Sequence, residues 1–219
     1  SESGIQTAQR MSNLFYDSLP IEIPVSLQII SFTEAKQEVQ KIQEIYNVLF
    51  VSGTEDPGVI GIPFIPLQDI ITTTNLDLVS TKLSGYLNED NLKQLIINVR
   101  RNFTLMNILN YLTILNPKPL LDATTAAIDT LQTRRKVNLE GRTLVAIYIH
   151  VCILIERLVT KTSVLQNDNA TDEFIKNHQD FIQDIHASFK NIESHYSIVI
   201  PDSEMKYIYS FFEHEGETK

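Results

Sequence analysis

The sequence predicts a mainly α protein: an antiparallel five-helix bundle preceded by a small α/β segment. Strict alternation of apolar and polar residues occurs only in the early part of the chain. From Leu92 onward, apolar residues instead recur at spacings of three and four. A period of two is typical of strands and a period of 3.6 is typical of helices. We therefore expect a mixed segment over residues 1–87 and a helical domain over residues 88–219.

The early segment contains the pattern of a strand, a helix and a second strand. Apolar residues alternate over residues 21–29, and Pro24 favours an edge position because it cannot donate to a sheet ladder. Ser31 and Glu34 have the spacing of a capping box, which predicts a helix that begins there. The continuous apolar run at residues 48–51 is typical of a strand covered on both faces. Strand, helix and strand in this order predict one small α/β unit.

A turn is expected directly after this unit. Residues 53–58 read Gly-Thr-Glu-Asp-Pro-Gly, and two prolines punctuate residues 62–66. A glycine-rich loop can also cradle phosphate, but this one lacks the closing Lys and Ser or Thr and carries two acidic residues. The sequence therefore favours a plain turn.

The helical domain begins with a long amphipathic helix that starts near Leu92. The prolines after Asn116 are expected to end it, since a helix rarely continues through proline. A polar loop is expected over residues 166–171. The other four helices are predicted around residues 121–131, 143–161 and 174–196, and from Ile200 onward. The helix at 143–161 is apolar nearly all round, which predicts the centre of a bundle.

The bulk composition is that of a soluble globular protein, with 43% hydrophobic and 21% charged residues among 219. No apolar run reaches the roughly 20 residues that a membrane helix requires. The N-terminal sequence has no signal pattern, and the single cysteine, Cys152, fits a reducing compartment. We therefore expect a cytoplasmic protein without a membrane contact.

The charge balance argues against a nucleic acid contact by this chain. Acidic residues outnumber basic ones by 27 to 18, which gives a formal net charge of −9. Binding to a phosphate backbone depends on clustered Lys and Arg. The two short basic clusters, Arg100-Arg101 and residues 134–136, are interpreted as solvated helix faces or ends.

Sequence motifs of enzymes and metal sites are absent. His178, His186 and His195 are too far apart along one predicted helix to form a compact set of metal ligands. The sequence has no nucleophile elbow and no zinc-protease motif, and its carboxylates are scattered. We therefore expect no enzymatic activity, no metal and no cofactor.

One constellation combines an imidazole and a guanidinium on an apolar helix. His150 lies in the most apolar predicted helix, and Arg157 follows two turns later on nearly the same face. Two interpretations are open. His150 is a core histidine satisfied by one hydrogen bond, or it is a nucleophile that accepts a phosphoryl group while Arg157 stabilises the phosphoryl oxygens.

A family resemblance favours the second interpretation. The spacing of His150, Glu156 and Arg157 in an apolar helix resembles the first phosphorylation motif of PTS regulation domains (PRDs). Residues 196–208, YSIVIPDSEMKYI, resemble the ending of that family, in which Pro is followed by Glu and then by Tyr-Ile. The similarity covers about residues 103–212.

The sequence most resembles the last PRD of LevR-like, sigma-54-dependent activators of sugar operons. Residues 115–117, Leu-Asn-Pro, precede the second helix as they do in those proteins. Residues 53–65 resemble the segment that follows their enzyme-IIA-like domain. By this resemblance, residues 1–87 form a small α/β segment or linker, and residues 88–219 form the PRD.

The sequence also departs from the family pattern at two positions. Ile149 precedes the first histidine, where many members have Asp. Many members also have a second histidine seven residues after the closing Glu, and here Phe211 follows Glu204 at that distance. Only His150 is therefore carried over as a phosphorylation site.

The resemblance implies the regulatory domain of a bacterial transcription activator of sugar-utilisation operons. It implies phosphorylation of His150 by the phosphocarrier HPr or a sugar-specific enzyme IIB, with Arg157 as the candidate phosphate-stabilising residue. It also implies a homodimer. The alternative is a dimerisation or partner-docking helical bundle that is not phosphorylated. A phosphotransfer intermediate is a third possibility, although no acceptor-side feature supports it.

Overall fold

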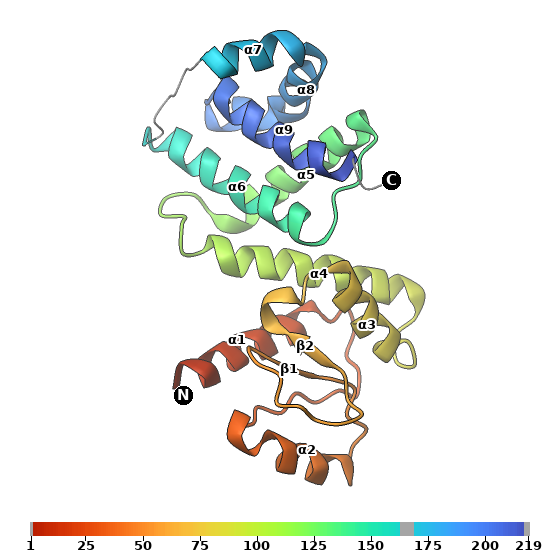
Figure 1. Cartoon of the computed structure of the whole chain (residues 1–219). Helices are drawn as coiled ribbons and strands as arrows, with labels where there is room; N and C mark the ends of the chain where they lie inside the picture. The colour runs from red at the N-terminus through yellow and green to blue at the C-terminus, as the bar shows by residue number, and fades with distance from the viewer. Residues whose placement is uncertain (1, 163–168, 217–219) are drawn as a thin grey trace. The chain divides into compact units, whose positions relative to one another are not determined.

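The computed structural model describes residues 2–162 and 169–216. The chain divides into two compact units, residues 1–103 and 104–219, and helix α4 (Glu89–Ile108) runs through the division (Figure 1). This division lies C-terminal to residue 88, the boundary suggested by the sequence. The fold is mainly helical with one two-stranded sheet, which confirms the predicted fold class.

The first unit begins with a helix that the sequence analysis did not predict, α1 (Glu2–Ser18). Leu14 and Phe15 lie on its buried face. The hydroxyl of Ser18 is fully buried, donates to the carbonyl of Leu14 (2.6 Å) and accepts from the side-chain amide of Asn102 (2.9 Å). These bonds satisfy polar groups at the C-terminal end of the helix.

The prediction of a strand over residues 21–29 is wrong. Alternate side chains from 23 to 27 are partly buried, as the alternation predicted, but the segment pairs with no strand in the described chain. The backbone N–H of Leu27 instead donates to the hydroxyl of Tyr16 (2.7 Å). Pro24 has no N–H to offer a ladder, so this extended segment lies on the unit as a single chain.

The helix predicted after Ser31 is present, whereas its capping interaction is not. A 3₁₀ turn (Phe32–Glu34) leads into α2 (Ala35–Gln43). The backbone N–H of Glu34 donates to the carbonyl of Ser31 (3.1 Å), and the Ser31 hydroxyl lies 3.0 Å from that of Thr33. The tight turn therefore uses the N–H that a capping box would have bonded to the serine side chain.

The sheet consists of two parallel strands, β1 (Val51–Gly53) and β2 (Phe64–Pro66). β1 overlaps only the end of the strand predicted at 48–51, and β2 lies where no strand was predicted. Both strands follow α2, so the predicted order of strand, helix and strand is wrong. The connection is a turn, as expected, and the carboxylate of Asp56 accepts from the N–H of Gly58 (2.7 Å).

A 3₁₀ turn (Leu67–Asp69), α3 (Thr73–Leu83) and the first part of α4 complete this unit. Its core consists of apolar side chains from the helices and from β2. Those with almost no exposed surface include Val39, Ile65, Leu76, Leu83, Leu95 and Val99.

Helices are the regular secondary structure of the second unit in its described part. After α4 it contains α5 (Pro117–Arg135), α6 (Gly141–Val159), α7 (Asn169–Asn177), α8 (Gln179–Tyr196) and α9 (Asp202–Gly216). α5 packs against α6 and α8, and α6 packs against α9 (Figure 1). Fully buried side chains at the centre include Leu121, Ile128, Ile147, Val151, Phe181, Phe189 and Ile208. Within residues 2–162 and 169–216, none of the helices combines the length and hydropathy of a membrane span.

The prolines after α4 begin a helix and do not end one. Asn116 is the N-cap of α5, its side-chain oxygen accepts from the N–H of Lys118 (3.3 Å), and Pro117 is the first helical residue. Proline suits this position because the first helical N–H has no partner within the helix. α4 already ends at Ile108, so residues 109–115 form a separate connection.

The single helix predicted over residues 174–196 is two helices, because the backbone at His178 leaves the helical region (φ −127°, ψ 35°). Residues 166–168 of the predicted polar loop lie outside the described residues, and α7 already begins at Asn169. The last helix, α9, begins near Ile200 as predicted.

Candidate functional site

Helix α6 carries both predicted site residues. Val151, Leu154 and Ile155 are buried against the core and fix how the helix is rotated. This rotation leaves His150 partly accessible, with 22% of its side chain exposed, and Arg157 is likewise partly buried. His150 is therefore neither sealed in the core nor free on the surface.

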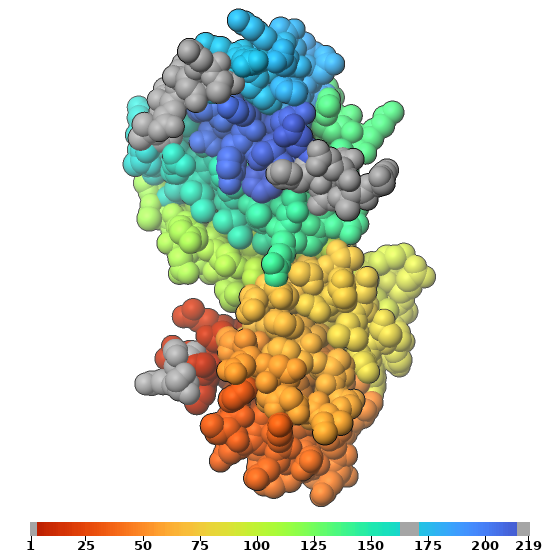
Figure 2. Space-filling model, viewed as in Figure 1, coloured from red at the N-terminus to blue at the C-terminus, as the bar shows by residue number. Residues whose placement is uncertain are grey.

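One face of α9 covers the His150 ring. The Oε2 atom of Glu204 lies 3.1 Å from Nε2 of His150. The Tyr207 ring lies against the imidazole with centroids 4.3 Å apart, and the Phe211 ring lies 6.2 Å away. Positions 204, 207 and 211 share one helix face. Figure 2 shows α9 (deep blue) forming the visible surface beside α6 (teal).

Glu204 lies close to His150 without forming a well-aligned hydrogen bond to it. Nε2 of His150 has almost no exposed surface, and its 3.1 Å separation from Glu204 lacks the alignment of a good hydrogen bond. The contact with His150 nevertheless lowers the pKa of the Glu204 carboxyl, partial burial opposes this shift, and the charge of Arg157 adds to it. Glu204 is thus an ionised carboxylate that interacts with both predicted site residues.

Glu156 has a structural role that differs from that of its neighbours in the motif. Its Oε1 accepts from the N–H and the hydroxyl of Thr113 (both 2.7 Å) and from the N–H of Ile114 (2.9 Å). Its Oε2 accepts from the N–H of Leu115 (3.0 Å). Burial raises the pKa of this carboxyl, but the donors outweigh burial and the pKa is lowered overall. The carboxylate fixes the connection after α4 to α6.

The other histidines that the sequence analysis considered have different surroundings. The His178 ring packs between Phe174 (centroids 4.7 Å apart) and Tyr209 (4.4 Å), whereas His186 and His195 are exposed on α8. In the part of the chain that the structure describes, no three His, Cys, Asp or Glu side chains are placed to hold a metal ion.

The basic cluster at the end of α5 is partly neutralised. Arg134 contacts one carboxylate oxygen of Asp184 (2.9 Å) and Arg135 contacts the other (3.1 Å), so Asp184 of α8 pairs with both. The Arg135 guanidinium also lies 5.5 Å from the centre of the Phe181 ring. The cluster is thus a link between two helices as well as a partly solvated helix end.

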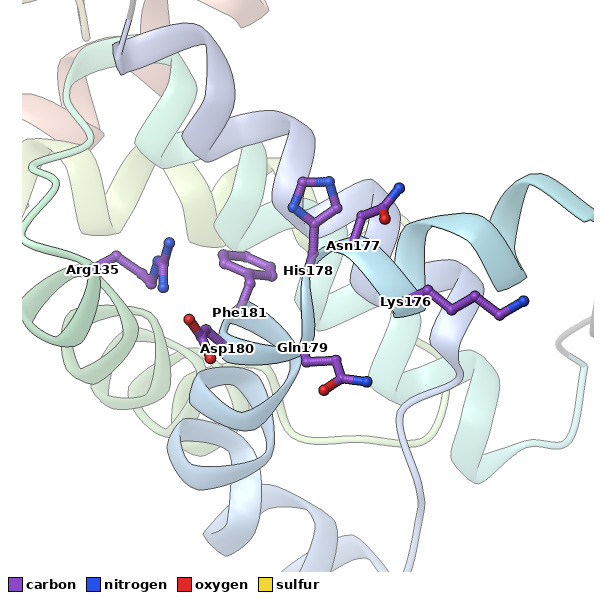
Figure 3. A pocket seen from close by; sticks show the side chains of 7 residues that line it. All are labelled: Arg135, Lys176, Asn177, His178, Gln179, Asp180 and Phe181. Carbon is purple, nitrogen blue, oxygen red and sulfur yellow. The ribbon is translucent and has the colours of Figure 1, made fainter.

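A pocket of about 240 Å³ opens where α7 meets α8, and no sequence pattern indicated it. Arg135, Asp180 and Phe181 gather on one side of it, and Lys176 extends away from them (Figure 3). Because Arg135 is already paired with Asp184, the pocket has no convergent set of unpaired charges. Neither His150 nor Arg157 lines it.

The covering of His150 by α9 was not predicted from the sequence. The signal was present, because Glu204 and Tyr207 belong to the closing motif and His150 to the first motif. The structure shows that these two motifs meet. It also places Phe211 beside His150. Phe211 stands at the position where many family members have their second histidine.

The profile of the PRD domain family matches residues 125–215, a range that includes His150, Arg157 and nearly all of α9. Residues 125–215 form a PRD domain. This confirms the resemblance predicted from the two motifs. The PRD domain therefore contains both sides of the contact between α6 and α9 described above.

Two curated relatives match nearly the whole chain at low identity. Transcriptional regulatory protein DagR of Salmonella typhimurium (strain 14028s / SGSC 2262) is 23% identical over 217 residues, which cover 94% of this chain and 23% of DagR. Transcriptional regulatory protein LevR of Bacillus subtilis (strain 168) is 21% identical over 201 residues, which cover 89% of this chain and 20% of LevR. The chain thus spans between a fifth and a quarter of their length. No solved structure matches the chain.

Proposed function

We propose that this chain is a regulatory region of a bacterial transcription regulator of sugar-utilisation operons, controlled by PTS-dependent phosphorylation of His150. The PRD domain and the names of the two relatives support the regulatory part of this proposal. The observation that carries the phosphorylation part is the placement of His150: a partly exposed imidazole on α6, with Arg157 two turns away and an ionised carboxylate at its Nε2.

The chemistry is a transfer between two imidazoles. A lone pair of His150 forms a new N–P bond while the N–P bond of a phosphohistidine donor breaks, and the electron pair of the broken bond stays on the donor. The guanidinium of Arg157 stabilises the phosphoryl oxygens through charge-assisted hydrogen bonds. HPr or a sugar-specific enzyme IIB is the proposed donor, which places the protein in the cytoplasm.

The regulatory effect follows from the added charge. A phosphoryl group brings about −2 of charge to the face between α6 and α9. Ionised Glu204 already lies there, so the two anions repel each other at short range. The contact between α6 and α9 must then rearrange, and we propose that a homodimer transmits this change.

The alternative is a docking or dimerisation bundle that is not phosphorylated. Two observations favour it: Phe211 replaces the family's second histidine, and Nε2 of His150 is covered by Glu204. In that case the His150–Glu204 contact would serve only to hold α9 on α6.

Reconstituted transfer distinguishes the two functions and identifies the donor. The chain is incubated with radiolabelled phosphoenolpyruvate and enzyme I, together with HPr alone or with HPr and the enzymes IIA and IIB. We expect stable label on the chain in at least one mixture and none when HPr is omitted. Absence of label in every mixture, with HPr itself labelled, would contradict the proposal and support the docking bundle.

A further inference from the structure

We propose that Glu204 is a positioning residue that occupies the place of a phosphoryl group on His150 and must withdraw before Nε2 can accept one. This inference rests on the proposed function and deepens it. The site then works by exchange of one anion for another: the Glu204 carboxylate in the resting form and the phosphoryl group in the modified form.

The first support is steric and electrostatic. The Glu204 oxygen lies 3.1 Å from Nε2, off the axis of a good hydrogen bond but within reach of any phosphoryl group that this nitrogen would carry. A phosphoryl group on Nε2, with its three oxygens, would therefore crowd the carboxylate in its present position. The repulsion between about −2 and −1 of charge in a partly buried site acts in the same direction.

The second support is the proton on the imidazole. The negative charge of Glu204, 3.1 Å from Nε2, favours the imidazole form that carries its proton on that nitrogen. That nitrogen then has no lone pair to attack phosphorus. When Glu204 withdraws, the neutral ring can carry its proton on Nδ1. The Nε2 lone pair then forms the N–P bond as the N–P bond of the phosphohistidine donor breaks, and the donor imidazole keeps the electron pair.

The third support is that the exchange needs no unfolding of α9. Met205 and Ile208 are fully buried and anchor the helix, while the Glu204 side chain is 20% exposed and can rotate toward water. The charge of Arg157 now acts on Glu204. After the exchange the same guanidinium faces the phosphoryl oxygens. Arg157 can therefore stay where it is while the anion that it interacts with changes from Glu204 to the phosphoryl group.

The test uses phosphoramidate, a small phosphoryl donor that requires no partner protein, on the whole chain. Glu204→Gln removes the charge and Glu204→Ala removes the group. Asp202→Asn is the control, because Asp202 is an exposed carboxylate in the same first turn of α9. Phosphorylation at His150 is followed by mass spectrometry, and the phosphohistidine isomer and the imidazole tautomer by ³¹P and ¹⁵N NMR.

We expect label on Nε2 to appear several-fold faster in Glu204→Gln, and faster still in Glu204→Ala, with Asp202→Asn unchanged. We also expect the unmodified imidazole to lose its preference for a proton on Nε2 in both Glu204 variants. Equal or slower labelling in the Glu204 variants, absence of labelling included, would overturn the inference, as would label on Nδ1 in the original chain. If phosphoramidate gives the expected pattern but no PTS donor labels the chain, the proposed function fails and the role of Glu204 stands.

Discussion

The carboxylate of Glu156 accepts both the backbone N–H and the hydroxyl of Thr113, each at 2.7 Å. It also accepts hydrogen bonds from two further backbone N–H groups. This buried carboxylate therefore supplies hydrogen-bond acceptors to backbone N–H groups that belong to no helix. Arg157 directly follows Glu156 on α6, and His150 lies two turns before Arg157 on the same helix. The Glu of the first motif therefore supports the site mechanically, and its neighbours carry the proposed chemistry.

Replacement of this carboxylate should destabilise the second unit. In Glu156→Gln an amide NH₂ must face a backbone N–H, so we expect a loss of about 2–3 kcal/mol in the free energy of unfolding. Urea denaturation followed by circular dichroism measures it. Glu173→Gln is the control, because Glu173 is exposed on α7, and it should change little. Equal stability of the two variants would show that the Glu156 contacts contribute nothing measurable.

The same residue predicts a pH dependence of stability. Hydrogen bonds lower the pKa of Glu156 in the folded chain below its ordinary value of 4.5, despite burial. The unfolded chain therefore binds the proton more readily, so this contribution is present above about pH 4.5 and is lost as pH falls through the folded pKa. The difference in unfolding free energy between the original chain and Glu156→Gln should shrink from pH 7 to pH 4. A difference independent of pH would contradict this assignment.

The helical part could be predicted in most of its outline because its apolar residues recur at helical spacing. The prediction fails at helix ends. Pro117 suggests the end of a helix that in fact stops at Ile108, and the break at His178 has no glycine or proline to mark it. The early segment was harder to predict. Alternation over residues 21–29 indicates which side chains are covered, but pairing depends on a neighbour strand that local pattern cannot supply.

The site could be predicted in part. His150 and Arg157 lie on one helix, where periodicity alone relates them. Glu204 and Tyr207 come from a helix far along the chain, and only the packing of α9 on α6 brings them to the imidazole. The structural role of Glu156 likewise depends on a distant connection that precedes α5.

Arg157 should matter more for phosphorylation than for folding. Arg157→Ala is expected to slow labelling by a PTS donor several-fold, because the guanidinium stabilises phosphoryl oxygens, and to change unfolding free energy by less than about 1 kcal/mol. Lys190→Ala, which removes an exposed cation from α8, serves as the control. Loss of stability without loss of labelling would instead show that Arg157 stabilises the helical bundle and does not act on the phosphoryl group.

The chain by itself should not bind promoter DNA specifically. Its net charge is −9, and Arg134 and Arg135 already contact Asp184. Since affinity for DNA depends on cations free to replace counterions, these arginines are poorly placed to supply it. Footprinting at physiological salt is expected to show no protected site, and a sequence-specific footprint would contradict this expectation.

The central claim is that His150 is the phosphorylated residue. The most direct measurement compares labelling by a PTS donor in the original chain, in His150→Ala and in His186→Ala, which removes an exposed histidine of α8. All three are first shown to be folded by circular dichroism. We predict that label is lost in His150→Ala and retained in His186→Ala, with the label mapped to His150 by mass spectrometry. Undiminished label in folded His150→Ala would contradict the account and assign the modification to another residue.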